Sequence, residues 1–340
     1  MRLTRRIRSS IVAVYLTTFG SACEGSISPP LFSQGATPIT NAVVNQTVPP
    51  AESCAQCHEE VVAQWSASRH AISHSNPNFL AAVAEAPQRE WCLNCHLPIR
   101  ASQETSSSPP RGVTCAVCHI REDTLLVAKP LSEWGRSEHP NAVVNPELSS
   151  SSFCAGCHQF AGPTNTHPVT FQGDPVQDTF GEWSRSPEPR ESCQQCHMPD
   201  GKHTFYGGHH LATLQSALEV TTHGRVLTIA TTPRVSHAVP TGDPFRRLVL
   251  RFCGPTCDTT VKTYTFAVIH TYVDGVMRVT KDTRMQANTS RQLPVPEDAF
   301  GWELRVYYAD PRLAEHLPEQ EVSMAVATGV FASPASPPEP

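Results

Sequence analysis

The residues best suited to chemistry in this chain form five Cys-x-x-Cys-His motifs. The thiols are Cys54 and Cys57, Cys92 and Cys95, Cys115 and Cys118, Cys154 and Cys157, and Cys193 and Cys196, and the histidines are His58, His96, His119, His158 and His197. In covalent haem attachment both thiols add to the vinyl groups of one haem, and the histidine bonds the iron as the proximal ligand. The alternative is zinc or disulfides, but zinc sites vary in spacing and do not require His directly after the second Cys. Five copies therefore predict five covalently bound haem c groups.

The second axial site of each iron separates electron carriers from enzymes. Eleven histidines lie outside the motifs, which is more than five distal positions require. His70 and His139 each follow a Trp-x-x-Ser-x pattern, and a third copy beginning at Trp183 has Glu188 in place of the histidine. Helical spacing puts the Trp and Ser on neighbouring faces, where they hold the approach of the imidazole. We predict His70 and His139 as distal ligands, with the third unit taking its ligand from elsewhere.

Further distal candidates follow the fifth motif. His203 and His209 are predicted as ligands, with His210 as the alternative in that segment, because the intervening glycines allow close backbone approach to a flat cofactor. His237 follows a predicted strand and precedes a Pro-Thr-Gly turn, so it could reach a haem from the C-terminal part. The remaining histidines are reserve candidates (His74 and His167) or ordinary surface and sheet residues (His223, His270 and His316).

The chain divides into segments of different composition. Residues 51–212 hold every motif, and their Pro, Ser and Gly content predicts short helices and loops organised by the cofactors. Residues 213–332 contain β-branched or alternating runs that predict an antiparallel β-sandwich. The predicted strands are residues 225–232, 247–252, 261–272, 276–280, 302–308 and 321–327, with a hairpin turn at Asp274-Gly275. Residues 24–50 are predicted to be a flexible tether, and residues 333–340 a disordered tail.

The first 23 residues are typical of an export signal. Four arginines precede an apolar run too short to span a bilayer. The run ends in Gly-Ser-Ala before Cys23, which favours lipid attachment at Cys23 as in bacterial lipoproteins, although Gly20 departs from the usual aliphatic residue. Ordinary cleavage near Ala22 is the alternative. We therefore expect an exported protein in the periplasm or at the outer membrane or cell surface. In such an oxidising compartment Cys253 and Cys257 are expected to form a disulfide, and a free or metal-binding pair is the alternative.

The charge balance restricts the partners. The formal net charge is −5, and ionised haem propionates would make the loaded protein more acidic. Nucleic acid requires a basic footprint, so it is not expected as a partner. Redox partner proteins are expected instead, and a lipid anchor would suit the soluble arm of an outer-membrane conduit.

The motif segment resembles the cytochrome c-554 family of multihaem cytochromes c. The similarity runs over residues 51–242, through Trp65 to His70, the motifs with their flanking residues 92–98 and 112–119, residues 182–199, and the segments around His203 and His237. The resemblance implies haems packed in stacked and perpendicular pairs, mostly with two histidine ligands. It also implies that the haems of the second and third motifs, which are close in sequence, form one close pair.

Two functions follow from these features. The first is electron transfer through closely packed haems with two histidine ligands each, which need no substrate site and no catalytic residues. The alternative is a multihaem oxidoreductase with one open-site haem, acting on a small nitrogen or sulfur compound. No motif histidine is replaced by lysine, as happens at the active haem of ammonia-forming nitrite reductases. We predict the electron carrier.

Overall fold

The computed structural model describes residues 51–84, 89–99, 112–121, 124–167, 169–187 and 190–331. These residues include all sixteen histidines of the chain. The predicted signal, tether, Cys23, Glu188 and the tail lie outside them. Within these ranges, no helix combines the length and apolar character needed to cross a membrane.

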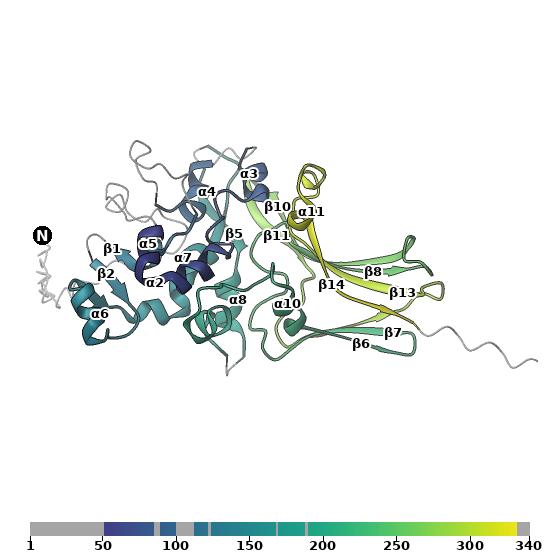
Figure 1. Ribbon diagram of the computed structural model, residues 1–340. Coiled ribbons are helices and arrows are strands. Elements are labelled where there is room, and N and C mark those ends of the chain that lie inside the picture. The colour runs from purple at the N-terminus through teal and green to yellow at the C-terminus, as the bar shows by residue number, and fades with distance from the viewer. Residues whose placement is uncertain are drawn as a thin grey trace, which may run out of the picture. The chain divides into compact units, whose positions relative to one another are not determined.

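Each haem motif lies on a helix (Figure 1), and in four of the five the motif histidine is the last residue of the helix. The helices that carry them are α2 (Ala51–Ser66), α4 (Arg89–His96), α5 (Cys115–His119), α7 (Ser151–His158) and α9 (Cys193–His197). The other short helices of this part are α3 (Pro77–Ala84), α6 (Glu133–Glu138), α8 (Thr179–Arg185) and the 3-10 turns η1 (Pro146–Ser149) and η2 (Pro199–Gly201). Serine side chains cap the N-termini of several of these helices, and Ser192 forms a capping box with Gln195.

Two small sheets join these helices, and the sequence did not predict either. The first contains β1 (Ile120–Arg121), β2 (Thr124–Val127) and β3 (Ala142–Val144), and the second contains β4 (Phe160–Pro163) and β5 (Phe171–Gln177). Strand β1 continues directly from the helix of the third motif, so the small sheet orients the residues that follow His119.

The C-terminal part is rich in β-structure and contains several sheets. One sheet has the order β12-β7-β6 and another the order β14-β13-β8-β9, while β10 and β11 form a hairpin (Figure 1). The strands are β6 (Leu218–His223), β7 (Val226–Thr231), β8 (Arg247–Cys253), β9 (Thr260–Phe266), β10 (Val268–Val273), β11 (Val276–Asp282), β12 (Ser290–Pro294), β13 (Gly301–Tyr307) and β14 (Ser323–Val330). The connecting helical turns are α10 (Leu211–Ala217), η3 (Ala314–His316) and α11 (Glu319–Val322).

One hydrophobic core is shared by the two larger sheets. Alternate residues of β7, β8 and β13 are buried, as the two-residue period of a strand requires. Leu227 and Ile229 of β7 belong to the same buried cluster as Leu250, Phe252 and Leu304 of the other sheet. Burying each such side chain stabilises the fold by roughly 1.5–3 kcal/mol. This core is independent of any cofactor.

The hairpin at Asp274-Gly275 is confirmed. Both residues have positive φ, 50° and 78°, which is the backbone conformation that a two-residue hairpin turn demands. The predicted single strand 261–272 is wrong in one respect, because the run breaks at Ala267. Residues before the break pair with β8, and residues after it pair with β11.

Hydrogen bonds and ion pairs connect the motif segment with the β-rich part, and the described residues fall in one compact unit. Gly275 of the hairpin accepts a hydrogen bond from the Asn165 backbone at 3.0 Å, and Arg278 pairs with Asp174 at 2.9 Å. The Arg69 guanidinium binds both carboxylate oxygens of Glu321, at 2.9 and 2.8 Å.

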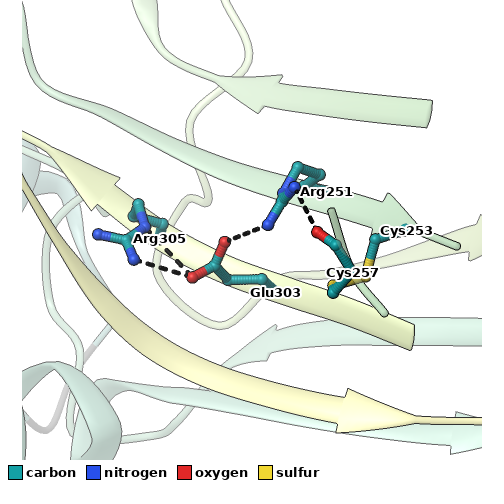
Figure 2. The surroundings of a disulfide bond; sticks show 5 residues. All are labelled: Arg251, Cys253, Cys257, Glu303 and Arg305. Atoms are coloured by element: carbon teal, nitrogen blue, oxygen red, sulfur yellow. Dashed lines mark hydrogen bonds and ion pairs between the residues drawn. A yellow bond between two sulfur atoms is a disulfide. The ribbon is translucent and has the colours of Figure 1, made fainter. Parts of the chain in front are cut away.

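The predicted disulfide between Cys253 and Cys257 is confirmed. Figure 2 shows its surroundings, where Arg251 donates a hydrogen bond to the Cys257 carbonyl at 3.0 Å. Arg251 also donates one hydrogen bond to the Glu303 carboxylate. The same carboxylate accepts two hydrogen bonds from Arg305. The disulfide therefore closes a turn at the end of β8 that is also tied to β13.

Candidate haem-binding site

The local structure of each motif suits covalent attachment to one flat ring. Two cysteines three residues apart lie on the same face of a helix, and the histidine follows at its end. In the first motif the helix is interrupted at the ligand itself, because His58 has φ −118° and ψ 42°. The motif histidine therefore ends or interrupts its helix.

Backbone carbonyls hold several of the imidazoles by their Nδ1 atoms. Nδ1 of His96 lies 2.9 Å from the Ser73 carbonyl, and Nδ1 of His119 lies 2.9 Å from the Leu126 carbonyl. His197 makes the same contact with Tyr206, and His237 with Ala238 at 3.0 Å. An Nδ1–H donated to a carbonyl leaves Nε2 as the free lone pair, which is the arrangement of a metal-binding histidine.

Four motif histidines face a second histidine at one constant spacing. The ring centroids of His58 and His139, His70 and His158, His119 and His203, and His197 and His237 are all 6.2 Å apart. The angles between the ring planes differ, at 13°, 56°, 37° and 14° respectively. A fixed separation with a variable angle indicates a shared axis about which each ring turns independently.

This spacing fits an iron held between two imidazoles. Each metal–nitrogen bond is about 2 Å, and each ring centre lies about 1 Å behind its bonding nitrogen, so the two centres come to about 6 Å apart. Direct stacking would bring the rings much closer, as with Tyr206 and His210 at 3.8 Å. Among the described residues, no three His, Cys, Asp or Glu side chains converge as a metal site. The side chains therefore fit a haem c with two histidine ligands, whose iron supplies a one-electron redox change.

Burial keeps four of the paired imidazoles neutral. Burial and, to a smaller extent, neighbouring histidines lower the pKa of His158 to about 3 and that of His70 to about 4. Burial is also the main reason why the pKa values of His203 and His237 are lowered. A neutral imidazole keeps the lone pair that a metal needs, so these histidines are available as ligands at neutral pH.

His96 of the second motif differs from the other four motif histidines. Its ring stacks on Phe79, with centroids 4.0 Å apart, and no histidine lies at the 6.2 Å spacing from it anywhere in the described chain. His74 and Asp243 are near enough to influence its pKa, which burial lowers. The second motif therefore has a proximal histidine without a facing one.

The remaining predicted ligand, His209, lies elsewhere. Its ring stacks on Tyr308 at 3.8 Å, and the alternative His210 stacks on Tyr206. His70, His139, His203 and His237 face motif histidines, whereas His209 faces none in the described residues. His270 bonds the Pro175 carbonyl at 3.0 Å, consistent with the ordinary sheet residue that was expected.

The two Trp-x-x-Ser-x-His segments have different environments. Trp65 is only 3% exposed and its indole N–H donates to the Val113 carbonyl at 2.8 Å, whereas Trp134 is 61% exposed. Ser137 bonds the Trp134 carbonyl, while Ser68 is buried. Both copies of the pattern thus end in a histidine that faces a motif histidine. The burial and the hydrogen bonds of the Trp and Ser residues differ between the two copies.

Ser73 was missed by the sequence reasoning. Its hydroxyl lies 3.0 Å from the carbonyls of both His70 and His96, and it accepts a hydrogen bond from the Val113 backbone at 3.1 Å. A Cβ at Gly112 would come within 2.0 Å of this hydroxyl. Ser73 and Gly112 therefore join two ligand-bearing segments to the start of the third motif, which no local pattern reveals.

Glu182 was matched to the family, but its contacts were not foreseen. One oxygen accepts hydrogen bonds from the Ala238 backbone and the Thr241 hydroxyl, both at 3.0 Å. The other oxygen pairs with Arg284 at 2.7 Å, and both side chains are largely buried. Glu182 thus holds the loop that carries His237 against helix α8.

Thiols of different motifs lie close together. Hydrogen-bond contacts join Cys54 to Cys115, Cys95 to Cys157, and Cys154 to Cys193. The first motif is therefore next to the third, and the fourth is next to both the second and the fifth. The described thiol contacts thus join the second motif to the fourth, while the close pair of the second and third haems stays a prediction.

The comparisons with known proteins agree with this geometry. The family model for cytochrome c554 and c-prime matches residues 53–120, which contain the first three motifs. No functionally curated protein matches the chain significantly. Among solved structures, a penta-heme cytochrome c552 from Thermochromatium tepidum is similar in fold, with a TM-score of 0.63 and 22% identity over 82% of this chain and 97% of that one. The chain is thus a multihaem cytochrome c related to the cytochrome c554 family.

Proposed function

We propose that the chain is an exported pentahaem c-type cytochrome that transfers electrons through closely packed haems. The observation that carries this proposal is the constant 6.2 Å spacing between four motif histidines and four distant histidines. An iron bound on both sides by imidazole has no free position for substrate, so it exchanges electrons without binding one. The contacts between thiols of different motifs support haems that lie near one another, as electron transfer requires.

The proposed axial pairs are assigned residue by residue. They are His58 with His139, His158 with His70, His119 with His203, and His197 with His237. His70, His139, His203 and His237 therefore keep the distal role predicted from the sequence, and His209 is reassigned because its ring lies against Tyr308.

Spectroscopy on the purified, haem-loaded chain tests this proposal. The pyridine haemochromogen spectrum and the intact mass should give five haems per chain. Low-temperature EPR should show four low-spin ferric haems with two histidine ligands. Fewer than four such signals in a fully loaded protein would contradict the proposed pairs.

A second candidate function rests on the haem of the second motif. His96 has no facing histidine, so the iron that it binds could keep one open position and act on a small molecule. Carbon monoxide bound to the reduced protein distinguishes the two functions. One molecule bound per chain supports an oxidoreductase with one open-site haem, and none supports a carrier in which another group closes the fifth iron.

The C-terminal part is proposed to be a β-sandwich that supplies a ligand. Two sheets that bury one common cluster of side chains are the arrangement that a sandwich needs. The loop between β7 and β8 carries His237 and is held by Glu182. Limited proteolysis before and after haem loading should show whether the C-terminal part keeps its fold alone.

Export and anchoring are proposed from the sequence of the first 23 residues. A lipid at Cys23 would hold the protein at a membrane while redox partner proteins dock on the haem part, for example at an outer-membrane conduit. Intact mass of membrane-extracted protein, compared with Cys23→Ser, tests the anchor. A mass difference no larger than that of the substitution itself, with equal release into the soluble fraction, would rule it out.

A further inference from the structure

Arg246 is a half-buried cation with few partners. It lies in the segment between His237 and β8, and its Nη1 donates one hydrogen bond to the Thr241 carbonyl at 3.0 Å. Within the described residues this is the only hydrogen bond of the guanidinium, which forms no ion pair there. A guanidinium carries five N–H donors in a planar fork. Taking such a charge out of water is costly without a counter-charge, so the free donors suit an anion.

We propose that Arg246 and His209 form an oxyanion-binding site between the second and fourth haem motifs. The shared chemistry of the ligand is a carboxylate or another small planar oxyanion, which the guanidinium fork matches with two parallel hydrogen bonds. The ligand has two possible sources, a propionate of one of the bound haems or a free anion. The inference rests on the proposed haem loading.

The backbone around Arg246 is shaped for close approach. Gly242 has a φ of 96°, and a Cβ there would lie 2.9 Å from Nη1 of Arg246. A Cβ at Gly208 would lie 3.6 Å from the same atom. The two glycines thus bring main chain from two distant segments to one side of the guanidinium, so that its other donors remain for a ligand.

His209 supplies a second donor, and Tyr308 positions it. The His209 ring stacks on the Tyr308 ring with centroids 3.8 Å apart and planes at 20°. The Tyr308 hydroxyl donates to the carbonyl of Gly208 at 2.7 Å, which fixes the residue before His209. Among the described residues neither ring nitrogen of His209 has a hydrogen-bond partner. The imidazole is therefore held in place with its polar atoms unused.

The charges around this pair support an anion over a cation. Burial and the neighbouring Arg246 and Arg69 lower the pKa of His209 to about 3, so it is a neutral donor at neutral pH. The carboxylate of Glu321 is already bound by Arg69 and by Asn76. Asp243 influences Arg246 electrostatically, and its backbone carbonyl accepts a hydrogen bond from the Arg246 backbone N–H at 3.1 Å. Among the described residues its carboxylate makes no bond to the guanidinium. The positive charge of Arg246 is thus the one left without a bonded partner in this cluster.

The cluster adjoins two haem motifs. Asp243 acts electrostatically on His96, and Arg246 acts on His158. Removing a positive charge close to a haem stabilises the ferric form, so the midpoint potential of that haem falls. An anion that binds beside the haem has the same effect, because it cancels the positive charge. The potentials therefore report on the site without any assay of activity.

The experiment uses the full haem-loaded chain, and haem content is counted first. A count below five in the wild type contradicts the proposed function and is separate from the test of the site. Midpoint potentials are then measured for the wild type, Arg246→Gln and Arg247→Gln, with chloride as the added anion and again with nitrite at equal ionic strength. Arg247→Gln is the matched control, because that guanidinium already bonds the Ala309 carbonyl at 3.0 Å and lies over the Tyr307 ring.

Either source of the oxyanion gives a distinct result. If a propionate occupies the site, Arg246→Gln lowers the potential of one haem, the control does not, and nitrite changes neither. If a free oxyanion occupies it, nitrite lowers one potential saturably in the wild type, and Arg246→Gln weakens that response about tenfold or more, as the loss of a charge-assisted hydrogen bond predicts. Equal potentials and equal nitrite responses in all three proteins would overturn the proposal. If Arg246→Gln loads haem poorly, Arg246→Lys and His209→Phe take its place, and wild-type behaviour in both would overturn the proposal equally.

Discussion

The imidazole rings of His197 and His237 lie almost parallel, with centroids 6.2 Å apart and planes at 14°. His197 is the histidine of the fifth motif, and His237 precedes the first strand of the larger sheet. The pair ties the cofactor-bearing segment to the β-rich part through one proposed iron. A change at His237 should therefore alter one haem and the junction between the two parts, while the other haems stay as they are.

The substitution His237→Gln tests this directly. Loss of the imidazole should convert one low-spin haem to high-spin, since no other histidine faces His197. EPR and the binding of one further carbon monoxide molecule by the reduced protein are the measurements. His223→Gln, on the exposed end of β6, is the control and should leave every haem signal unchanged. An unaltered spectrum in His237→Gln would remove this pair from the assignment.

Glu182→Gln should destabilise the protein and disturb the same haem. The substitution leaves Arg284 without one of its buried carboxylate partners and weakens the bonds to Ala238 and Thr241. Breaking a buried pair costs about 3 kcal/mol. Chemical unfolding followed by circular dichroism measures the loss, and the exposed Glu219→Gln is the matched control. If Glu182→Gln and Glu219→Gln unfold alike, Glu182 does not hold the His237 loop.

Acid should weaken the contact between Arg69 and Glu321. The bond from Arg69 lowers the pKa of Glu321, so the carboxylate contributes stability that is present above its unfolded pKa of about 4.3 and is lost as the pH falls through its lower folded pKa. At pH 7, Glu321→Gln should be less stable than the wild type by about 2 kcal/mol. The difference should shrink steadily below about pH 4. Unfolding curves at several pH values check this, with the exposed Glu319→Gln as control, and a pH-independent difference would contradict it.

The disulfide should stabilise the β-rich part without affecting the haems. Cross-linking so short a loop contributes about 2 kcal/mol in the chain-entropy model. Cys257→Ser should lower the unfolding temperature. Reduction of the wild type by a thiol should lower it equally, because a thiol does not reduce haem thioethers. Thr256→Ser in the same turn is the control. A shift in any haem potential would show that the turn acts on the haem part as well.

The five motif histidines could be proposed as proximal ligands from the sequence, because covalent attachment confines two thiols and a histidine to five consecutive residues. The distal ligands depend on contacts between distant segments. His203 and His209 lie in one short segment, yet Phe205, with a φ of 49°, turns the backbone so that only His203 faces a motif histidine. No local pattern contains that turn. Likewise Trp65 and Trp134 share a pattern but not a degree of burial.

The β-rich part was predicted best where strands alternate between apolar and polar residues. Strands β6 and β12 were missed. The sequence of β12, Ser-Arg-Gln-Leu-Pro, has a single large apolar residue, Leu293, which its pairing with β7 buries. The small sheets around β2 and β5 were missed because each strand is short and its partners lie in other segments. Pairing of this kind is decided by packing and has no periodic signal in the chain.

The four facing pairs also have a consequence for biogenesis. In three of them the second histidine lies much later in the chain than the motif it faces, and only His70 precedes its motif. If the protein is exported from its N-terminus onward, haems attached to the first and third motifs must wait with one vacant coordination position until His139 and His203 have crossed the membrane. Shielding these immature irons from stray ligands would then be a task for the machinery that attaches haem, and a truncation before His203 should trap the third haem in its unfinished form.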